Sequence, residues 1–441
     1  MKIALITSFP PSRHALNEYG FHVADQLRQE PSVDLTVLGD YLSAPADELP
    51  GFKVDRCWGF GKAGNVATIL RAIRRAKPDV AWFNLGFASF GDRPLSAVLG
   101  LVTPAAARLT GVHSHVTLHQ LFETVDLQDA AVSLPRLYRA GGWLATHLLL
   151  SANSLSVLMP AYGRTLDEKY RRGRVNVRSH GIFTARPDPP DFTRRGSPTH
   201  SILAFGKWGT YKRLELLIEA FERVATKLPN VRLVIGGSDH PKTPGYVQSM
   251  AQRHASDQIR FLGYVAEDSI PDLFRDASLA VMPYTSSAGS SGVAHLAAQY
   301  GVPVIASGIQ DFRELAEHEG IAMRFFTPGD VDSLVEQLLQ ALNSPSELKE
   351  MAWRSYAAGI AMSMPLVVRE YIRSFRQHER IKTLQLAAGL RRAGQFRRSE
   401  ELARTVGEKI QRWPDEDGIN NSIVERGSIM ERGALVLPGA A

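Results

Sequence analysis

The sequence predicts an α/β fold made of two doubly wound domains in series. Short apolar segments alternate with amphipathic helical segments, and this alternation is typical of parallel sheets that helices cover on both faces. The alternation stops in the proline-rich and charged stretch 182–200 and starts again after it. The length of 441 residues is sufficient for two or three domains of ordinary size.

The first domain is predicted at residues 1–181. Its strand segments are nearly continuous apolar runs, as expected of strands that are buried on both faces. Its helical segments carry apolar residues at helical spacing. In chain order, the strands are predicted at 2–9, 33–40, 79–86, 113–120 and 147–154, and the helices at 19–29 and 65–78.

The second domain is predicted at residues 201–360, after a linker at 182–200. Ligands of open parallel sheets bind outside the carboxyl ends of the strands, so two facing domains would place a site in the cleft between them. Strand segments recur at 201–208, 231–237, 258–265, 277–284 and 301–307, with an amphipathic helix at 213–228. Beyond them we expect a helix at 361–380 that crosses back to the N-terminal domain, a helical hairpin extension at 381–412 and a poorly ordered tail at 413–441.

Composition narrows the class of protein further. A content of 44% hydrophobic and 22% charged residues is that of a soluble globular protein. The single cysteine, Cys57, excludes a disulfide framework and a cysteine-based zinc site, and it favours the cytoplasm. The N-terminus reads as a strand rather than a secretion signal. The apolar stretch 141–159 contains several polar residues and precedes Pro160, so we expect a buried strand and helix there and no membrane span.

The chain is basic, with a net charge of +6. Its arginines form two clusters, Arg71, Arg74, Arg75 and Arg171, Arg172, Arg174. These clusters would attract an anionic partner, such as a nucleotide or the inner face of a membrane in a peripheral contact. Solvated helix faces are the favoured interpretation. Without interleaved aromatic residues, nucleic acid is not a predicted partner.

Two lysines follow the first strand of the second domain. Gly206 permits a turn, Lys207 and Lys212 come next, and an amphipathic helix begins after them. Two cations beside a helix N-terminus can bind a diphosphate. Isolated lysines are more often ordinary surface residues, so this interpretation depends on the surrounding segments.

A second anion-binding candidate is the loop before the helix in AGSSGVAHLAAQ, residues 288–299. Backbone amides of Ser291, Gly292 and Val293 at a helix N-terminus would suit a phosphate oxygen or sugar hydroxyls. Ser290 and Ser291 add hydroxyl groups. Helix capping by a serine would explain the same residues without a ligand.

Nine segments in order resemble the family-four retaining glycosyltransferases of the GT-B fold, also described as group 1 glycosyl transferases. They are FPPSRHALNEYGFHVADQL, KPDVAWFNLG, VTLHQ, VRSHGI, GKWGTYKRLELLIEAF, LVIGG, IRFLGYV, LFRDASLAVMPY and GVPVIAS. The resemblance runs from Met1 to about Arg376. It implies two Rossmann-like domains that face each other across a cleft, with the acceptor on the N-terminal domain and a nucleotide-sugar donor on the C-terminal one.

The resemblance also implies the reaction. A hexose would move from a nucleotide diphosphate sugar to a hydroxyl acceptor, either a glycan, a lipid-linked molecule or a small molecule, without a cofactor or a metal. Lys212 matches the lysine that binds the donor diphosphate. Lys207 stands where the family has an arginine, so the charge is kept and the bidentate fork is lost. His119, in VTLHQ, matches the histidine near the reacting centre of the sugar.

The resemblance implies further residues that contact the donor or the acceptor. Gly20 falls in the family's glycine-rich turn, where a backbone approaches the ligand closely. Glu18 replaces one glycine of that turn and could contact an acceptor hydroxyl or amine, although an exposed first-turn acid is the commoner case. The segment of Gly263, Tyr264 and Val265 resembles the one whose backbone binds the nucleotide base.

Two glutamates of the family pattern are missing. Alignment on Gly301 places them at Ala288 and Leu296. The second one binds the ribose in the family, and His295 could replace it only if the helix were rotated, because adjacent helical residues point about 100° apart. Loss of one charged acceptor costs about 1.5–3 kcal/mol, which other contacts can offset. A rearranged enzyme is therefore favoured. A phosphorylase that uses inorganic phosphate, and a non-catalytic scaffold, remain as alternatives.

Overall fold

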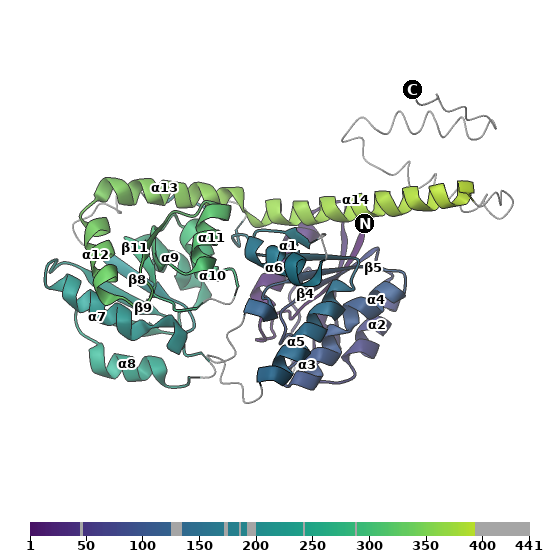
Figure 1. Ribbon diagram of the computed structural model, residues 1–441, viewed down its shortest axis with the longest axis horizontal. Helices are drawn as coiled ribbons and strands as arrows, with labels where there is room; N and C mark the ends of the chain where they lie inside the picture. The colour runs from purple at the N-terminus through teal and green to yellow at the C-terminus, as the bar shows by residue number, and fades with distance from the viewer. Residues whose placement is uncertain are drawn as a thin grey trace, which may run out of the picture. The chain divides into compact units, whose positions relative to one another are not determined.

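The computed structural model describes residues 1–44, 47–124, 135–171, 175–184, 187–191, 200–240, 243–286 and 289–392. The chain divides into two compact units, Met1–Val368 and Arg369–Ala441. The first unit contains two parallel β-sheets with their helices (Figure 1). The predicted fold class, two doubly wound Rossmann-like halves, is confirmed.

The first sheet has seven parallel strands in the order β3-β2-β1-β4-β5-β6-β7. Every residue of β4 is buried, as expected of a central strand covered on both faces. The strands are β1 (Lys2–Ile6), β2 (Asp34–Asp40), β3 (Val54–Trp58), β4 (Val80–Leu85), β5 (His113–Leu118), β6 (Ser154–Val157) and β7 (Val175–Val177). Strand β3 was not predicted. It contains Asp55 and Arg56, and these charges interrupt its apolar pattern.

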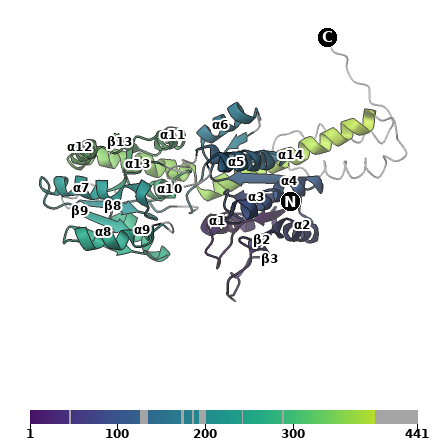
Figure 2. The ribbon, with the colours of Figure 1, turned by 60° about the horizontal axis from the view of Figure 1, so that its bottom comes forward.

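Helices connect these strands. Helix α2 packs beside β2 and β3 (Figure 2). The helices are α1 (Asn17–Gln29), α2 (Asn65–Ala76), α3 (Pro94–Leu101), α4 (Thr103–Leu109), η1 (Phe122–Thr124, a 3₁₀ helix), α5 (Pro135–Leu150) and α6 (Pro160–Tyr170). The strand predicted at 147–154 is wrong, because its first half is the last turn of α5 and only its final residue belongs to β6. A short apolar run does not distinguish a buried strand from a buried helix.

The second sheet has six parallel strands in the order β10-β9-β8-β11-β12-β13. They are β8 (Ser201–Phe205), β9 (Arg232–Gly236), β10 (Ile259–Gly263), β11 (Leu279–Met282), β12 (Val304–Ser307) and β13 (Met323–Phe326). The connecting helices are η3 (Thr210–Lys212), α7 (Leu214–Ala225), α8 (Tyr246–His254), η4 (Glu267–Ser269), α9 (Ile270–Asp276), α10 (Gly292–Gln299), α11 (Gln310–Glu319) and α12 (Val331–Leu342). Figure 1 shows α7 and α12 on one side of β8 and β9, and α10 and α11 on the other.

Both sheets reverse their strand order at one place. In the first sheet β1 lies between β2 and β4, and in the second β8 lies between β9 and β11. The connections from these central strands therefore run to opposite sides, and the loops at their carboxyl ends diverge. A ligand site is expected in the opening that the diverging loops leave.

Two more helices follow, α13 (Pro345–Ala361) and α14 (Met364–Arg392). The junction between them is tied to the start of the predicted linker, because Ile182 exchanges backbone hydrogen bonds with Met362 and Met364. The boundary between the two compact units falls within α14. The predicted hairpin at 381–412 lies mostly outside the described residues, and the tail at 413–441 lies wholly outside them.

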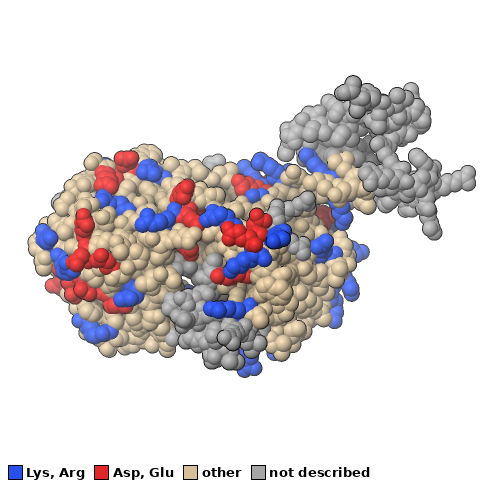
Figure 3. All heavy atoms as spheres, viewed as in Figure 1, with Lys and Arg blue, Asp and Glu red and all other residues tan. Residues whose placement is uncertain are grey.

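Surface charge is mixed. Figure 3 shows lysine and arginine side chains interspersed with aspartate and glutamate on the face that it presents. Arg71, Arg74 and Arg75 lie exposed on α2, and Arg75 pairs with Asp55 at 2.6 Å. This cluster fits the interpretation as a solvated helix face. Of the second cluster, Arg172 and Arg174 lie outside the described residues.

Candidate functional site

The turn after β8 places Lys212 in an aromatic surround. The side chain is only 8% exposed. Its Nζ lies 4.7 Å from the ring centroid of Tyr284, 5.8 Å from that of Trp208 and 6.0 Å from that of Tyr211. Gly206 has a φ of 137°, a backbone conformation that favours glycine, and a Cβ atom there would lie 2.7 Å from this Nζ.

Lys212 carries its charge without a carboxylate partner among the described residues. Burial and, to a lesser extent, the nearby charge of Lys207 together lower the pKa of Lys212 to about 8. The aromatic rings offset part of the desolvation by cation–π attraction. Lys207 itself is exposed. The arrangement holds a partly desolvated cation at the carboxyl end of β8, where an anionic ligand would complete it.

Gly237, after β9, closes against the same turn. A Cβ atom on it would lie 1.8 Å from the carbonyl oxygen of Gly206, and both glycines have positive φ angles, 112° and 137°. Only glycine fits such a close backbone approach. Gly237 was not predicted as a site residue, although it is the last residue of the conspicuous segment LVIGG.

The loop before α10 supplies polar groups beside this turn. Ser291 is the N-cap of the helix and accepts a hydrogen bond from Ala294 N at 3.4 Å, so the capping role considered for it is present. The hydroxyl of Ser290 is buried and has no partner among the described residues. Gly292, the first residue of α10, is exposed. These groups leave a hydroxyl and helix N-terminal amides for a ligand.

This loop approaches both sheets. A Cβ atom on Gly206 would lie 3.5 Å from Val293 Cγ2, and one on Gly289 would lie 3.0 Å from the carbonyl oxygen of His119. The structure thus brings the lysine turn, the serine loop and His119 together, although they come from three distant parts of the sequence.

His119 lies at the carboxyl end of β5 and is held by Asn84. Its Nε2 is 2.6 Å from Asn84 Oδ1, and Asn84 Nδ2 donates to Thr7 Oγ1 at 3.0 Å. Because the amide nitrogen is engaged with Thr7, Oδ1 faces the ring, and Nε2 carries the proton. Burial lowers the pKa of His119 to about 3, so the ring is neutral. Its Nδ1 can therefore accept a hydrogen bond. Thr7 and Asn84 were not predicted, but each lies at the end of a strand.

Gly20 is the fourth residue of α1. A Cβ atom there would be 2.5 Å from Thr7 Oγ1 and 2.9 Å from the carbonyl oxygen of Ser8. Glycine is thus required for α1 to pack against the turn after β1. The adjacent Tyr19 contacts the ring of His119 edge-on, with centroids 4.5 Å apart. The contact of Gly20 with the donor sugar nucleotide stays a prediction.

His295 forms a buried ion pair. Its Nε2 lies 2.8 Å from Glu319 Oε2, with side chains 3% and 1% exposed, and its Nδ1 donates to the Ser291 carbonyl at 2.7 Å. Burial alone would lower the pKa of His295, but Glu319 and that carbonyl outweigh it and raise the pKa. Both ring nitrogens therefore already have protein partners, so a ribose contact would have to displace one. The ring lies 4.6 Å from that of buried His180.

Of the two positions where the family has glutamates, the structure describes only Leu296. Leu296 is partly buried and packs against the hydrophobic core. Ala288 lies outside the described residues. Nothing at Leu296 can accept a hydrogen bond from a ribose.

Glu18 lies near Lys207 and near Glu267, which follows the predicted base-binding segment by two residues. The pKa of Glu18 is raised, first by burial and then by the neighbouring Glu267, while Lys207 opposes the shift. The side chain of Glu18 nevertheless remains exposed. Gly263 has a φ of 63°, and Tyr264 is 79% exposed, so its ring is available to a ligand. Val265 is half-buried.

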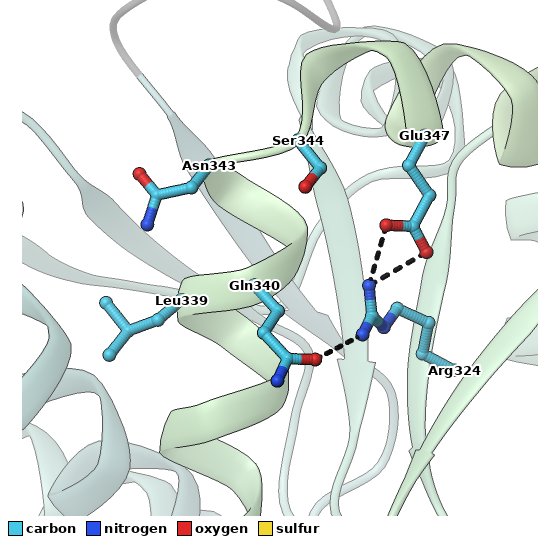
Figure 4. Close-up of a pocket in the computed structure, with 6 residues that line it drawn as sticks. All are labelled: Arg324, Leu339, Gln340, Asn343, Ser344 and Glu347. Carbon is cyan, nitrogen blue, oxygen red and sulfur yellow. Dashed lines mark hydrogen bonds and ion pairs between the residues drawn. The ribbon is translucent and has the colours of Figure 1, made fainter.

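A separate recess lies between α12, α13 and β13 (Figure 4). Its arginine, Arg324, contacts both carboxylate oxygens of Glu347 at 2.8 Å and donates to Gln340 at 2.6 Å. The guanidinium is thus satisfied by the protein, and none of the predicted site residues lines the recess. We interpret it as structural. Among the described residues, no helix has the length and apolar character that a membrane crossing requires.

Comparisons with known proteins show which family and which fold this chain resembles. Residues 199–344 match the family described as "Glycosyl transferases group 1". Mannosylfructose-phosphate synthase of Agrobacterium fabrum is 31% identical over 88 residues, which are 18% of this chain and 19% of that protein. The match thus spans less than a fifth of that relative.

Two solved structures share the fold. Sucrose-phosphate synthase of Thermosynechococcus elongatus has a TM-score of 0.67 at 15% identity and covers 86% of this chain and 99% of its own. Alr3699/HepE of Anabaena, in complex with UDP and glucose, has a TM-score of 0.62 at 17% identity and covers 86% and 99%. The GT-B fold predicted from the sequence is therefore confirmed.

Proposed function

We propose, from the premise that residues 199–344 form a group 1 glycosyltransferase domain within a GT-B fold, that this protein is a retaining glycosyltransferase. It would move a hexose from a nucleotide diphosphate sugar to a hydroxyl acceptor. The observation that carries the proposal is Lys212, a buried ammonium group at the carboxyl end of β8 that no carboxylate neutralises among the described residues.

The lysine pair would stabilise the leaving group. As the bond between sugar and diphosphate breaks, negative charge grows on the departing phosphate oxygen. Lys212 is fixed by its aromatic surround, whereas Lys207 is exposed and can adjust to the ligand. The hydroxyl of Ser290 and the amides at the start of α10 would bind further phosphate or sugar oxygens.

His119 would position the sugar. Because its Nε2–H is committed to Asn84, the neutral ring offers Nδ1 as an acceptor for a sugar hydroxyl. With a pKa near 3 it would not act as a general acid or base at neutral pH. The proton of the incoming hydroxyl would then go to the donor phosphate itself.

The donor's nucleotide is supported by one relative. Alr3699/HepE has this fold and is described in complex with UDP and with UDP-glucose, which makes a uridine nucleotide the first to test. The acceptor remains a hydroxyl of unspecified class.

A phosphorylase is the second candidate. Leu296 removes the acceptor that would bind ribose, and inorganic phosphate needs no ribose contact. The same lysines would then bind phosphate rather than a diphosphate.

Thermal-shift measurements with UDP-, GDP-, ADP- and dTDP-sugars and with inorganic phosphate separate these functions. The glycosyltransferase predicts stabilisation by one nucleotide sugar and release of its nucleoside diphosphate when an acceptor is supplied. NMR of the product should show that the anomeric configuration is retained. Stabilisation by phosphate and by no nucleotide would replace the proposal with the phosphorylase. If neither class of ligand binds, both enzymatic functions are wrong.

A further inference from the structure

Helix α1 and the 3₁₀ helix η4 bring three metal-ligating side chains together. We propose that Glu18, His22 and Glu267 bind a divalent transition-metal ion, such as Zn²⁺, that links α1 to η4. One ligand atom from each side chain lies within 4.8 Å of the other two. Glu18 and His22 are four residues apart on α1 and share one helix face, whereas Glu267 comes from the loop after β10.

The ligand types fit such an ion. Zinc binds imidazole nitrogens and carboxylate oxygens at about 2.0–2.2 Å, usually with four ligands, so three protein groups would leave one position for water. Tetrahedral ligand atoms at that bond length are about 3.4 Å apart. The side chains of Glu18 and Glu267 are exposed, so rotations about their own bonds can close the remaining gap.

The imidazole of His22 is held in a fixed orientation. Its ring stacks on Phe183 with centroids 4.4 Å apart and an angle of 7° between the planes, which fixes its orientation. No hydrogen bond within the described part of the chain engages either ring nitrogen.

The two carboxylates lie close together. One oxygen of Glu18 and one of Glu267 are within 4.8 Å of each other, so their like charges repel. Neither carboxylate has a hydrogen bond or an ion pair with another described residue. The exposed Lys207 lies near Glu18 but forms no ion pair with it among the described residues. A divalent ion would relieve the repulsion more completely than this single charge.

The position gives the ion a role as a clamp. Glu18 precedes Gly20 by two residues, and Glu267 follows Val265 by two, so the ion would join the predicted turn of the first sheet to the predicted base-binding segment of the second. The lysines would still neutralise the diphosphate, so the prediction of metal-independent transfer is unaffected. The metal site itself does not depend on the proposed transfer activity.

Co²⁺ titration of the chelator-treated full-length chain tests the site. Co²⁺ bound to nitrogen and oxygen ligands has visible d–d absorption. The only cysteine of the chain, Cys57, is buried in the first sheet, so it is not expected to contribute to this absorption. We expect saturation at one equivalent, displacement by Zn²⁺, and a rise in Tm with Zn²⁺. Each of the variants Glu18→Gln, His22→Ala and Glu267→Gln should weaken binding at least about tenfold.

Two variants serve as matched controls. Asp268→Asn removes an exposed carboxylate next to Glu267, and His254→Ala removes a histidine that pairs with Glu222 elsewhere. Both should bind Co²⁺ as the wild type does. The proposal is overturned if the triple variant of Glu18, His22 and Glu267 keeps the Co²⁺ spectrum and the Zn²⁺-induced rise in Tm, or if the wild type shows no saturable binding.

Discussion

Two buried bases in this protein differ in how their charge is compensated. His295 is paired with the Glu319 carboxylate at 2.8 Å, which raises its pKa, whereas Lys212 has aromatic neighbours and a pKa lowered to about 8. A cation that the protein itself neutralises is a structural element. One that lacks an anion is costly in the free protein and gains from an anionic ligand.

The same contrast explains how the site can lack the usual glutamates. His295 cannot simply take over the ribose contact, because its charge is already used to hold α10 to α11. Lys212, by comparison, retains its full capacity for a phosphate. The donor's binding energy is therefore expected to come mainly from the diphosphate rather than from the ribose.

The largest expected effect is on stability, from removal of one partner of the buried pair. His295→Leu should lower the free energy of unfolding by about 3–5 kcal/mol, because the Glu319 carboxylate would remain buried without a counter-charge. Urea denaturation measures this. The double variant His295→Leu/Glu319→Leu should recover most of the loss, since apolar replacement of a whole buried pair is often neutral.

The pair His254–Glu222 is the matched control. It is separated by 3.3 Å with side chains 30% and 55% exposed, so His254→Leu should cost only about 0–1 kcal/mol. In the wild type, the contribution of His295 is complete below about pH 6.5, the ordinary histidine pKa, and is lost as the pH rises through the raised pKa of the folded protein. Equal costs for the buried and exposed variants would remove the structural distinction between the two bases.

The second largest effect is on activity rather than on stability. Lys212→Met should lower kcat/KM by about 100- to 1,000-fold, the usual cost of losing one group that stabilises developing charge. Its free energy of unfolding should stay constant or rise, because methionine fills the aromatic surround without a desolvated charge. Nucleoside diphosphate release and urea denaturation measure the two quantities.

Lys227→Met, which changes an exposed lysine just after α7, is the control and should alter neither quantity. If Lys212→Met unfolded easily and kept its turnover, Lys212 would be a structural residue like His295.

The sequence predicts the two sheets and the lysine turn, because both follow from local patterns of apolar residues and turn residues. It does not predict that Tyr284 lies beside Lys212, since Tyr284 follows β11 by two residues and comes more than seventy positions later in the chain. It also misses the pairing of His295 with Glu319, which depends on how α10 and α11 pack. Partners of a buried charge are set by tertiary packing, and the spacing of residues in one segment does not encode them.

The smallest effect is the pH dependence of nucleoside diphosphate binding. In the free protein Lys212 begins to lose its proton near pH 8, so above this pH the affinity for UDP should fall by up to about tenfold per pH unit, or about 1.4 kcal/mol. Calorimetry at pH 8 in buffers of different ionisation enthalpy should show proton uptake on binding, because the diphosphate raises the pKa of Lys212.

The stability of the free protein should also depend on pH. Its free energy of unfolding should increase as the pH rises from about 8 toward about 10.4, since the unfolded lysine holds its proton more tightly than the folded one. Lys212→Met should abolish both trends, whereas His295→Leu should leave them in place. If the proton uptake persists in Lys212→Met, another group binds the phosphate, and the contrast between the two buried bases does not explain donor binding.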